Sequence, residues 1–404
     1  MEQKIDILTA EAADLLKGMI AIPSESFNEA DVCSYISDWM TSKQIIHKRI
    51  GNNLIARLSE QNGMADKTFT NKPTLMLCAH IDTVSASEGY SFDPYVPDYT
   101  RAAEVISAKI AEGALPEAPS ATVNEDGIVA GLGSNDDGAS VVSMIAAFRY
   151  FRTPSVISGE VEISHDLLLV LTCEEERSGV NGMTGLWGNI LCNASRTDND
   201  AAIKVNYAIV GEPTGMKAAT AERGLLVIDA TAHGVSGHAA RNEGINAIDI
   251  AIKDIETLKA HTFTKVSPRM GKVNLNVTQI NAGTAHNVIP DTCTFVIDIR
   301  PTEQYTNEEI LNELQSICKS DLKPRNLKNQ SSATHENSPL QSAAESLGIE
   351  TFSSPTTSDW IRIDCDAIKM GPGNSARSHR KDEFIFTDEI NNGISTYIRF
   401  IEAL

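Results

Sequence analysis

The chain has 404 residues, of which 42% are hydrophobic and 22% charged, an ordinary globular composition and a length that favours two hydrophobic cores. Its formal net charge of −20 argues against a nucleic-acid partner and against docking on an anionic membrane, because both need a basic patch. The sequence contains neither an apolar run of about 18 residues nor the layout of a signal peptide. The 7 cysteines are scattered without a CxxC pair, which favours reduced thiols in a cytoplasmic protein.

The first half of the chain alternates helix and strand. Within the runs 74–78 and 166–172, residues 75–78 and 167–171 are all apolar, which is typical of strands buried on both faces of a sheet. This alternation predicts an α/β sheet layered with helices. Helices are predicted over 5–20, 29–43 and 139–148, and strands over 53–58, 74–78, 166–172 and 208–210.

From about Gly224 the pattern changes to that of a small α+β unit. The order of strand, helix, two strands and helix indicates the split βαβ type. Its elements are predicted over 225–232, 245–260, 272–280, 292–300 and 307–320. The tail from about Asn329 is expected to return to short strands and loops. The segment Pro97–Asn124 looks less regular and is interpreted as an insertion near a loop.

Two histidines stand where apolar strands give way to turns. His80 follows the run Leu75–Ala79, with Asp82 two residues later, and His379 is presented from the Gly- and Pro-rich segment Gly371–Glu383. In an open α/β sheet, ligands bind at the carboxyl ends of the strands. An imidazole there can bind a metal while a carboxylate holds its other nitrogen. The alternative is a satisfied strand-end histidine beside a turn aspartate.

Acidic residues occupy comparable positions. Asp136 lies in a Gly-rich turn, where it either caps the next helix or bridges metal ions, and Glu212 follows another short strand. The three consecutive glutamates at 174–176 end the apolar strand 166–172. Clustered carboxylates repel one another unless a cation neutralises them. A solvated charge run is the common explanation of acids in a row, but the buried strand before them weakens it.

The number of these groups matters more than any one of them. Two histidines and several carboxylates at strand ends suit a pair of zinc-like ions with mixed nitrogen and oxygen ligands. Two such ions, about 3.5–4 Å apart, polarise a carbonyl and lower the pKa of a bridging water. A free glutamate beside them can take the proton of that water. The sequence therefore predicts a two-metal hydrolytic site.

In their order and spacing, the segments from His80 to His379 resemble the M20 metallopeptidase family over nearly the whole chain. The resemblance implies an α/β fold with a zinc-peptidase-like catalytic domain, in which helices flank a central mixed sheet. It also implies an inserted α+β, ferredoxin-like domain that acts as lid and dimerisation domain. The expected bounds are 1–217 and 329–404 for the catalytic domain and 218–328 for the insert.

The same resemblance implies a role for each candidate residue. Asp82 would hold the imidazole of His80, and Glu175 would be the general base, although the extra Glu174 leaves an ambiguity of one residue. Many relatives carry a lysine soon after the bridging aspartate, where this chain has Asp137-Gly138-Ala139. The metal ligands would be His80, Asp136 as the bridging carboxylate, Glu176, Glu212 and His379.

Within the insert, the segment Val235–Ala240 looks like the GHxA segment of the family. The resemblance implies that His238 reaches the active site of the neighbouring subunit of a homodimer and stabilises the tetrahedral oxyanion. Asn287 and Arg300 would clamp the carboxylate of the substrate, a task for which the guanidinium fork is suited. Without the resemblance, His238 would be interpreted as a loop residue and Arg300 as a surface residue.

The implied function is hydrolysis of the amide bond of a small N-acyl amino acid, with two divalent ions, Zn²⁺ or alternatively Co²⁺. Residues 131–136, 236–244 and 371–379 look most like the branch that acts on N-acetylornithine in arginine biosynthesis. One alternative is an N-succinyl amino-acid desuccinylase, in which Arg377 or Arg380, which flank His379, would bind the second carboxylate unless these arginines pair with Asp382 or Glu383. Others are an M20 dipeptidase and a metal-free scaffold of the same fold, although every expected position is filled.

Overall fold

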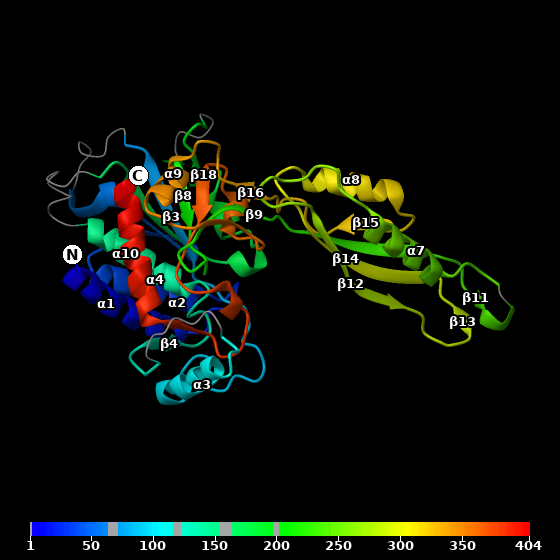
Figure 1. The fold of residues 1–404 in the computed structure, drawn as a ribbon, viewed down its shortest axis with the longest axis horizontal. Helices are drawn as coiled ribbons and strands as arrows, with labels where there is room; N and C mark the ends of the chain where they lie inside the picture. The colour runs from blue at the N-terminus through cyan, green and yellow to red at the C-terminus, as the bar shows by residue number, and fades with distance from the viewer. Residues whose placement is uncertain (1, 64–71, 116–122, 153–162, 197–201, 242) are drawn as a thin grey trace. The chain divides into compact units, whose positions relative to one another are not determined.

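A computed structural model of the protein describes residues 2–63, 72–115, 123–152, 163–196, 202–241 and 243–404. The chain forms two units, both drawn in Figure 1. The larger unit comprises Met1–Thr220, Thr334–Phe352 and Ser358–Leu404, and the smaller comprises Ala221–Ala333 and Ser353–Thr357. The bounds expected from the sequence differ from these at 218–220, which belong to the larger unit, and at 329–333, which belong to the smaller one, and they place 353–357 in the catalytic domain. This segment instead attaches to the smaller unit, where Ser353 Oγ donates to the carbonyl of Arg269 at 2.9 Å.

A mixed sheet forms the centre of the larger unit, with the strand order β1-β2-β5-β3-β8-β18-β9-β16. Strands β5, β3, β8 and β18 are parallel, and the strands toward both edges pair antiparallel. The predicted α/β fold with a central mixed sheet is therefore confirmed. The strand bounds are β1 Lys48–Ile50, β2 Asn53–Arg57, β3 Thr74–His80, β5 Asp166–Thr172, β8 Tyr207–Val210, β9 Ala218–Glu222, β16 Ser332–Ala333 and β18 Asp366–Lys369.

Both faces of the central strands are covered, which explains their uninterrupted apolar sequence. Along β3, Leu75, Leu77 and Ala79 join one core, whereas Met76 and Cys78 join another on the opposite face. Three long helices pack against one another over the first core, as Figure 1 shows. They are α1 (Glu2–Ile20), α4 (Gly138–Phe151) and α10 (Thr387–Ala403).

A helix occupies the segment that was interpreted as an irregular insertion. α3 spans Tyr99–Ala111, and the side chain of Asp98 caps it by accepting the backbone N–H of Arg101 at 3.2 Å. It packs against β4 and buries residues at helical spacing, so the interpretation of this part as irregular was wrong. Pro116 and Pro119, which suggested it, lie outside the described residues.

The C-terminal tail also contains helices that the sequence analysis did not predict. α9 spans Pro339–Ser346, and α10 closes the chain. α10 buries Ile390, Ile394, Tyr397 and Ile401, which recur every three to four residues. The expectation of short strands and loops alone is corrected here, because the apolar spacing of this segment is helical.

The smaller unit has its own core and a four-stranded antiparallel sheet in the order β12-β14-β10-β15. With two helices between the strands, the element order is the predicted split βαβ arrangement. Its main elements are β10 Leu226–His233, α7 Ala247–Ala260, β12 Asn274–Ala282, β14 Thr292–Arg300, α8 Asn307–Ile317 and β15 Asp321–Pro324, and a two-stranded ribbon joins β11 Gly237–His238 to β13 Val288–Ile289.

The remaining elements are short or lie beside the central sheet. They are α2 Ala30–Ser42, α6 Met183–Leu186, β4 Ile128–Ala130, β6 Leu191–Asn193, β7 Ile203–Val205, β17 Thr351–Ser354 and β19 Phe384–Phe386, with short 3₁₀ turns between them. Among the described residues, no helix combines the length and apolar character needed to cross a membrane.

Candidate active site

The predicted site residues of the larger unit gather where its parallel strands end. His80 is the last residue of β3 and lies in register with Thr172, the last residue of β5, after which the chain enters 174–176. Glu212 follows β8 by two residues, and His379 lies in the segment after β18. Because parallel strands end at the same edge of a sheet, four distant segments of the sequence converge there.

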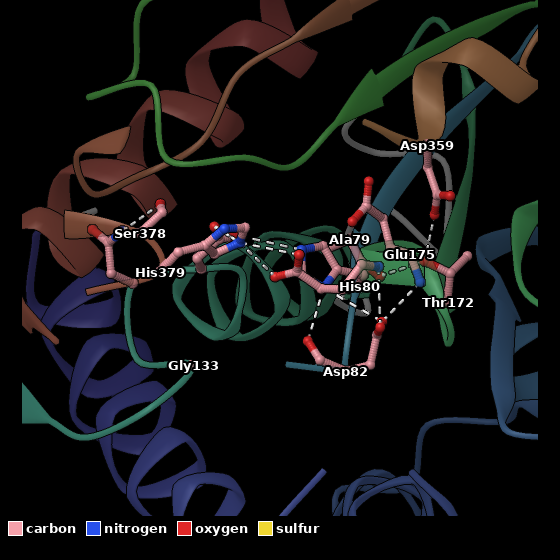
Figure 2. Close-up of polar contacts among 12 residues, drawn as sticks. Ala79, His80, Asp82, Gly133, Thr172, Glu175, Asp359, Ser378 and His379 are labelled. Atoms are coloured by element: carbon pink, nitrogen blue, oxygen red, sulfur yellow. Dashed lines mark hydrogen bonds and ion pairs between the residues drawn. The ribbon is translucent and has the colours of Figure 1, made fainter. Parts of the chain in front are cut away.

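Asp136 lies between the two histidines. Its Oδ1 is 3.2 Å from Nε2 of His80, and its Oδ2 is 3.7 Å from Nε2 of His379. The same nitrogen of His379 lies 3.0 Å from the carboxylate of Glu176. Figure 2 shows His80 at the end of β3 and His379 reaching toward it from the C-terminal segment. A carboxylate that faces two imidazoles has the geometry of a ligand shared by two ions.

Two groups of side chains bring their ligand atoms within 4.8 Å of one another: His80 with Glu175 and Glu212, and His80 with Asp136 and Glu176. Burial, together with neighbouring carboxylates, raises the pKa of Glu175 and of Glu212 well above the ordinary value. A cation would relieve this crowding. The donor set of imidazole nitrogens and carboxylate oxygens therefore fits divalent ions of the zinc type.

The histidines respond to the same acids in the opposite sense. Burial opposes a charge on His80, but hydrogen bonds to Asp136 and Asp82 outweigh it and raise its pKa well above the ordinary value. The hydrogen bond to Glu176 raises the pKa of His379 to about 9, although partial burial opposes it. A metal ion must therefore displace protons from both imidazoles when it binds.

Asp82 connects the first histidine to the glutamates. Its backbone carbonyl accepts Nδ1–H of His80 at 2.9 Å, and its carboxylate lies 3.5 Å from the same nitrogen. The carboxylate also accepts the backbone N–H groups of Glu175 at 3.0 Å and Glu176 at 3.2 Å, and the hydroxyl of Ser26 at 2.7 Å. Asp82 thus directs Nε2 of His80 toward the site and holds the turn that carries both glutamates.

Glu174 is turned away from both groups of ligand atoms. Its carboxylate accepts the backbone N–H of Asn181 at 3.0 Å and the side-chain amide of the same residue at 2.6 Å. Its own N–H donates to the buried carboxylate of Glu29 at 3.2 Å, which holds the backbone at a φ of 60°. This geometry leaves Glu175 and Glu176 as the two glutamates that face the site.

Three buried acids near the site were not assigned a role from the sequence. Asp359 accepts the hydroxyl of Thr172 at 2.7 Å, close to Glu175 in Figure 2, and burial raises its pKa to about 6. Burial also raises the pKa of Asp137 to about 8, and that of Glu383 to about 8. Single acids in loops carry no motif, so one sequence offers no signal for Asp359, and Glu383 was considered only as a partner of arginine.

In the smaller unit, two of the predicted residues lie together and the third lies far away. β11 pairs with β13, so that His238 faces Val288, and the carbonyl of Asn287 accepts the N–H that follows His238. His238 and Asn287 are both exposed. Arg300 stands at the opposite end of β14, a 9-residue strand that spans about 26 Å. Asn287 and Arg300 of one subunit therefore cannot grip the same small carboxylate.

The two predicted substrate arginines are both engaged with acids. Arg300 forms a two-pronged ion pair with Asp298, at 2.8 and 3.1 Å. Arg377 is only 6% exposed, donates to both carboxylate oxygens of Glu389 at 2.6 and 3.0 Å, and stacks over Phe384. The prediction that Arg377 binds substrate is therefore corrected. The predicted alternative, pairing with Asp382 or Glu383, is also wrong, because Glu389 is the partner.

The chain matches known proteins over both units. Residues 220–326 match the family model described as the M20 peptidase dimerisation domain. Acetylornithine deacetylase from Proteus mirabilis is 25% identical to the chain over 92% of this chain and 91% of its own length. Succinyl-diaminopimelate desuccinylase from Corynebacterium glutamicum is 28% identical over 69% of this chain and 62% of its own length.

Solved structures share the fold at low sequence identity. An aminopeptidase from Bacillus cereus has a TM-score of 0.67 and 16% identity, with 98% of each chain covered. A dinuclear metal-binding peptidase of the M20 family from Bacillus subtilis has a TM-score of 0.64 and 14% identity, again with 98% of each chain covered. The fold, the inserted domain and these relatives define a metal-dependent hydrolase. Residues 220–326 match the dimerisation domain of the M20 peptidases, and the whole chain is similar to proteins of that group, in agreement with the resemblance seen in its sequence.

Proposed function

We propose that the protein removes the acyl group from the nitrogen of an N-acyl amino acid, and we favour N-acetylornithine, an intermediate of arginine biosynthesis, as the substrate. The convergence of His80, Asp136 and His379 with several glutamates at one sheet edge is the observation that carries the proposal. Relatives that the chain matches over at least nine-tenths of its length are named acetylornithine deacetylase, which supports the choice of substrate.

A pair of divalent cations, Zn²⁺ or alternatively Co²⁺, would polarise the amide carbonyl and lower the pKa of the attacking water. Glu175 then takes a proton from that water and delivers it to the nitrogen of the leaving amine. Asp82 keeps this base in place through the backbone N–H of Glu175. The residues that would hold the cations are His80, Asp136, Glu176, Glu212 and His379. All 7 cysteines are free, which supports a reducing compartment such as the cytoplasm.

The neighbouring glutamates offer a matched test of the general base. Glu175→Gln keeps the shape of the side chain but removes its ability to take a proton, so turnover of N-acetylornithine should be lost while two metal equivalents remain bound. Glu174→Gln is the control, because Glu174 faces Asn181 instead of the site. Turnover and metal content are measured on both variants. If Glu175→Gln retains turnover or Glu174→Gln loses it, the base is assigned to the wrong residue.

We also propose that the protein acts as a homodimer through the smaller unit. The matched family model is that of a dimerisation domain, and it covers nearly all of that unit. β12 is an edge strand of 9 residues whose side chains are mostly exposed, including Ile280 at 51% exposure. A long exposed edge of this kind is protected in natural proteins by pairing or by cover. A second copy of the chain would supply that cover.

In such a dimer, His238 would serve the active site of the partner. His238 lies near one end of β14 and Arg300 lies at the other. This separation supports the proposal that the two ends of the smaller unit have different roles. The test mixes the variants Glu175→Gln and His238→Ala, each of which should have little activity, and allows the subunits to exchange. After random exchange, half of the dimers contain one subunit of each variant. If His238 acts across the dimer, each of these mixed dimers has one intact site of its two, so activity returns to about a quarter of the original. Failure to regain activity after verified exchange excludes the role.

An N-succinyl substrate is the second candidate, because one of the relatives is named succinyl-diaminopimelate desuccinylase. The burial of Arg377 withdraws one of the two arginines that could have bound the second carboxylate, whereas Arg380 is exposed. We favour the acetyl substrate because the relatives that match the chain over nine-tenths of its length are named acetylornithine deacetylase. The specificity constants for N-acetylornithine and N-succinylornithine are to be compared with the same metal. A clear preference for the succinyl compound would reverse this choice, and cleavage of unblocked dipeptides alone would indicate a dipeptidase.

A further inference from the structure

The carboxylate of Glu383 is enclosed by the loop that carries Asp136. Glu383 is only 2% exposed. Its Oε1 accepts the backbone N–H groups of Asn135 and Asp136, both at 2.9 Å, and its Oε2 accepts that of Gly133 at 3.1 Å. The backbone carbonyl of Glu383 accepts a fourth N–H group, from Gly131, at 2.9 Å. One residue therefore satisfies most of the N–H groups of this loop.

Other hydrogen bonds also shape the loop: Leu132 N–H donates to the carbonyl of Pro94 at 2.8 Å, and the hydroxyl of Ser134 donates to the carbonyl of Gly131 at 2.6 Å. Gly133 has a φ of 76°, and a Cβ atom there would lie 2.6 Å from Thr83, so no side chain can hold the loop at this point. The side chain of Asn135 pairs in both directions with the backbone of Asn374, at 2.9 and 3.1 Å. The anchors supplied by Glu383 and Asn374 come from the C-terminal segment that also presents His379.

The same segment thus carries one predicted metal ligand and holds the backbone of another. Asp136 Oδ2 lies 3.7 Å from His379 Nε2, so any displacement of the loop changes the distance between the two ligands directly. Three N–H donors on one carboxylate restrict the loop in position and orientation, because each donor constrains a different peptide. The geometry of the ligand pair then depends on a residue that does not itself face the site.

We propose that Glu383 is a positioning residue that sets Asp136 relative to His379 and thereby determines how tightly the protein holds its divalent ions. The inference rests on the proposed function, because it assumes that Asp136 and His379 are metal ligands. Glutamine at position 383 offers one acceptor oxygen where the loop uses two. At least one N–H group then faces an amide NH₂ and loses its partner.

Asp382 provides a matched control. It is also buried, and it accepts the backbone N–H of Ser91 at 2.6 Å, the hydroxyl of the same residue at 3.0 Å and the ammonium of Lys109 at 2.7 Å. Its contacts are as numerous as those of the Glu383 carboxylate, but they lead away from the Asp136 loop. Asp382→Asn therefore tests for a general loss of stability in this segment, and Glu383→Gln tests for a specific loss of ligand geometry.

The experiment measures metal binding to the metal-free protein, with Co²⁺ followed by its absorption and Zn²⁺ by competition with a chromophoric chelator. Glu383→Gln should weaken at least one site by roughly 10- to 100-fold, as changes behind metal ligands do. Glu383→Asp should weaken it less, because both acceptor oxygens remain. Asp382→Asn should bind as tightly as the unsubstituted protein, even where urea unfolding shows that it is less stable.

Three outcomes separate the alternatives. If Glu383→Gln binds both ions as tightly as the unsubstituted protein, or if Asp382→Asn weakens binding equally, Glu383 has no positioning role. If Glu383→Gln does not fold, unchanged binding by Glu383→Asp overturns the inference and weakened binding supports it. If the unsubstituted protein itself binds no divalent ions, the proposed function fails, and the inference fails with it for that separate reason.

Discussion

Replacement of Asp82 by asparagine should damage both the metal site and the base. Three donors approach the carboxylate of Asp82: the hydroxyl of Ser26 and the backbone N–H groups of Glu175 and Glu176. The imidazole of His80 donates to the backbone carbonyl of Asp82 and lies 3.5 Å from the carboxylate. Asparagine has a single side-chain acceptor oxygen, and its NH₂ group must face at least one of these donors. Since Asp82 is 1% exposed, water cannot replace the lost acceptor.

The size of the effect follows from these contacts. Hydrogen bonds to a charged group contribute about 1.5–3 kcal/mol each, so the loss of one or two should cost about 3 kcal/mol of unfolding free energy. A displaced turn moves Glu175, and a misplacement of about 1 Å can cost roughly 100-fold in rate. Metal affinity should fall by roughly 10- to 100-fold, because the imidazole of His80 loses part of its support.

The assay combines kcat/KM for N-acetylornithine, metal titration and urea unfolding, with Ser26→Ala as the control. Ser26→Ala removes only the contact of 2.7 Å to Asp82 and leaves the histidine and the two glutamates in place. It should cost about 1 kcal/mol of stability and little activity. If Asp82→Asn keeps normal kcat/KM and normal metal affinity, the connection between His80 and the glutamate turn has no functional role.

The same residue predicts a pH dependence of stability in the metal-free protein. Burial raises the pKa of Asp82, but its contacts with His80 and the other donors outweigh this and lower it below the ordinary aspartate value. The folded pKa is therefore depressed, so the stabilisation is present above the ordinary aspartate range and is lost as pH falls through the folded pKa. Urea unfolding at several acidic pH values should show this loss, and Asp82→Asn should reduce it.

Further results are expected at His379, Arg377 and Ile280. Because the pKa of His379 is raised to about 9, the apparent metal affinity should increase as pH rises toward that value. Calorimetry in two buffers should detect the protons that are released when the metal binds. Metal binding without proton release would contradict this expectation. Arg377→Ala should cost about 1–3 kcal/mol of stability, because it removes a buried guanidinium and leaves the partly buried Glu389 without its cationic partner. The same variant should leave the ratio of acetyl to succinyl turnover unchanged, and a shifted ratio would restore Arg377 as a substrate ligand. Ile280→Asp on the exposed edge strand should weaken a homodimer in sedimentation measurements, and an unaffected dimer would mean that β12 lies outside the interface.

The parallel strands explain why much of the site could be predicted. The largely apolar runs 74–78 and 166–172 are typical of strands with both faces buried, and such strands lie in the centre of a parallel sheet. Their carboxyl ends share one edge, so residues such as His80 and Glu175 had to approach each other whatever the rest of the fold. The position along each strand pointed to these residues, and the resemblance to the M20 family assigned their roles.

Contacts across the fold were not predictable in this way. Arg377 and Glu389 are 12 positions apart and belong to different elements, and their pairing depends on how α10 lies against the segment before it. Glu383 could not be recognised either, because its partners are backbone N–H groups about 250 residues away, which leave no pattern in side-chain types.

By itself, the sequence determined which residue types stand at the ends of buried strands, and hence the class of chemistry that the sheet edge can support. Only the tertiary structure decided which acids face the histidines, which face away, and which arginine is already paired. The physical reason is that burial and strand period are local properties of the chain. The pairing of charges depends on distances between segments that only the packed fold establishes.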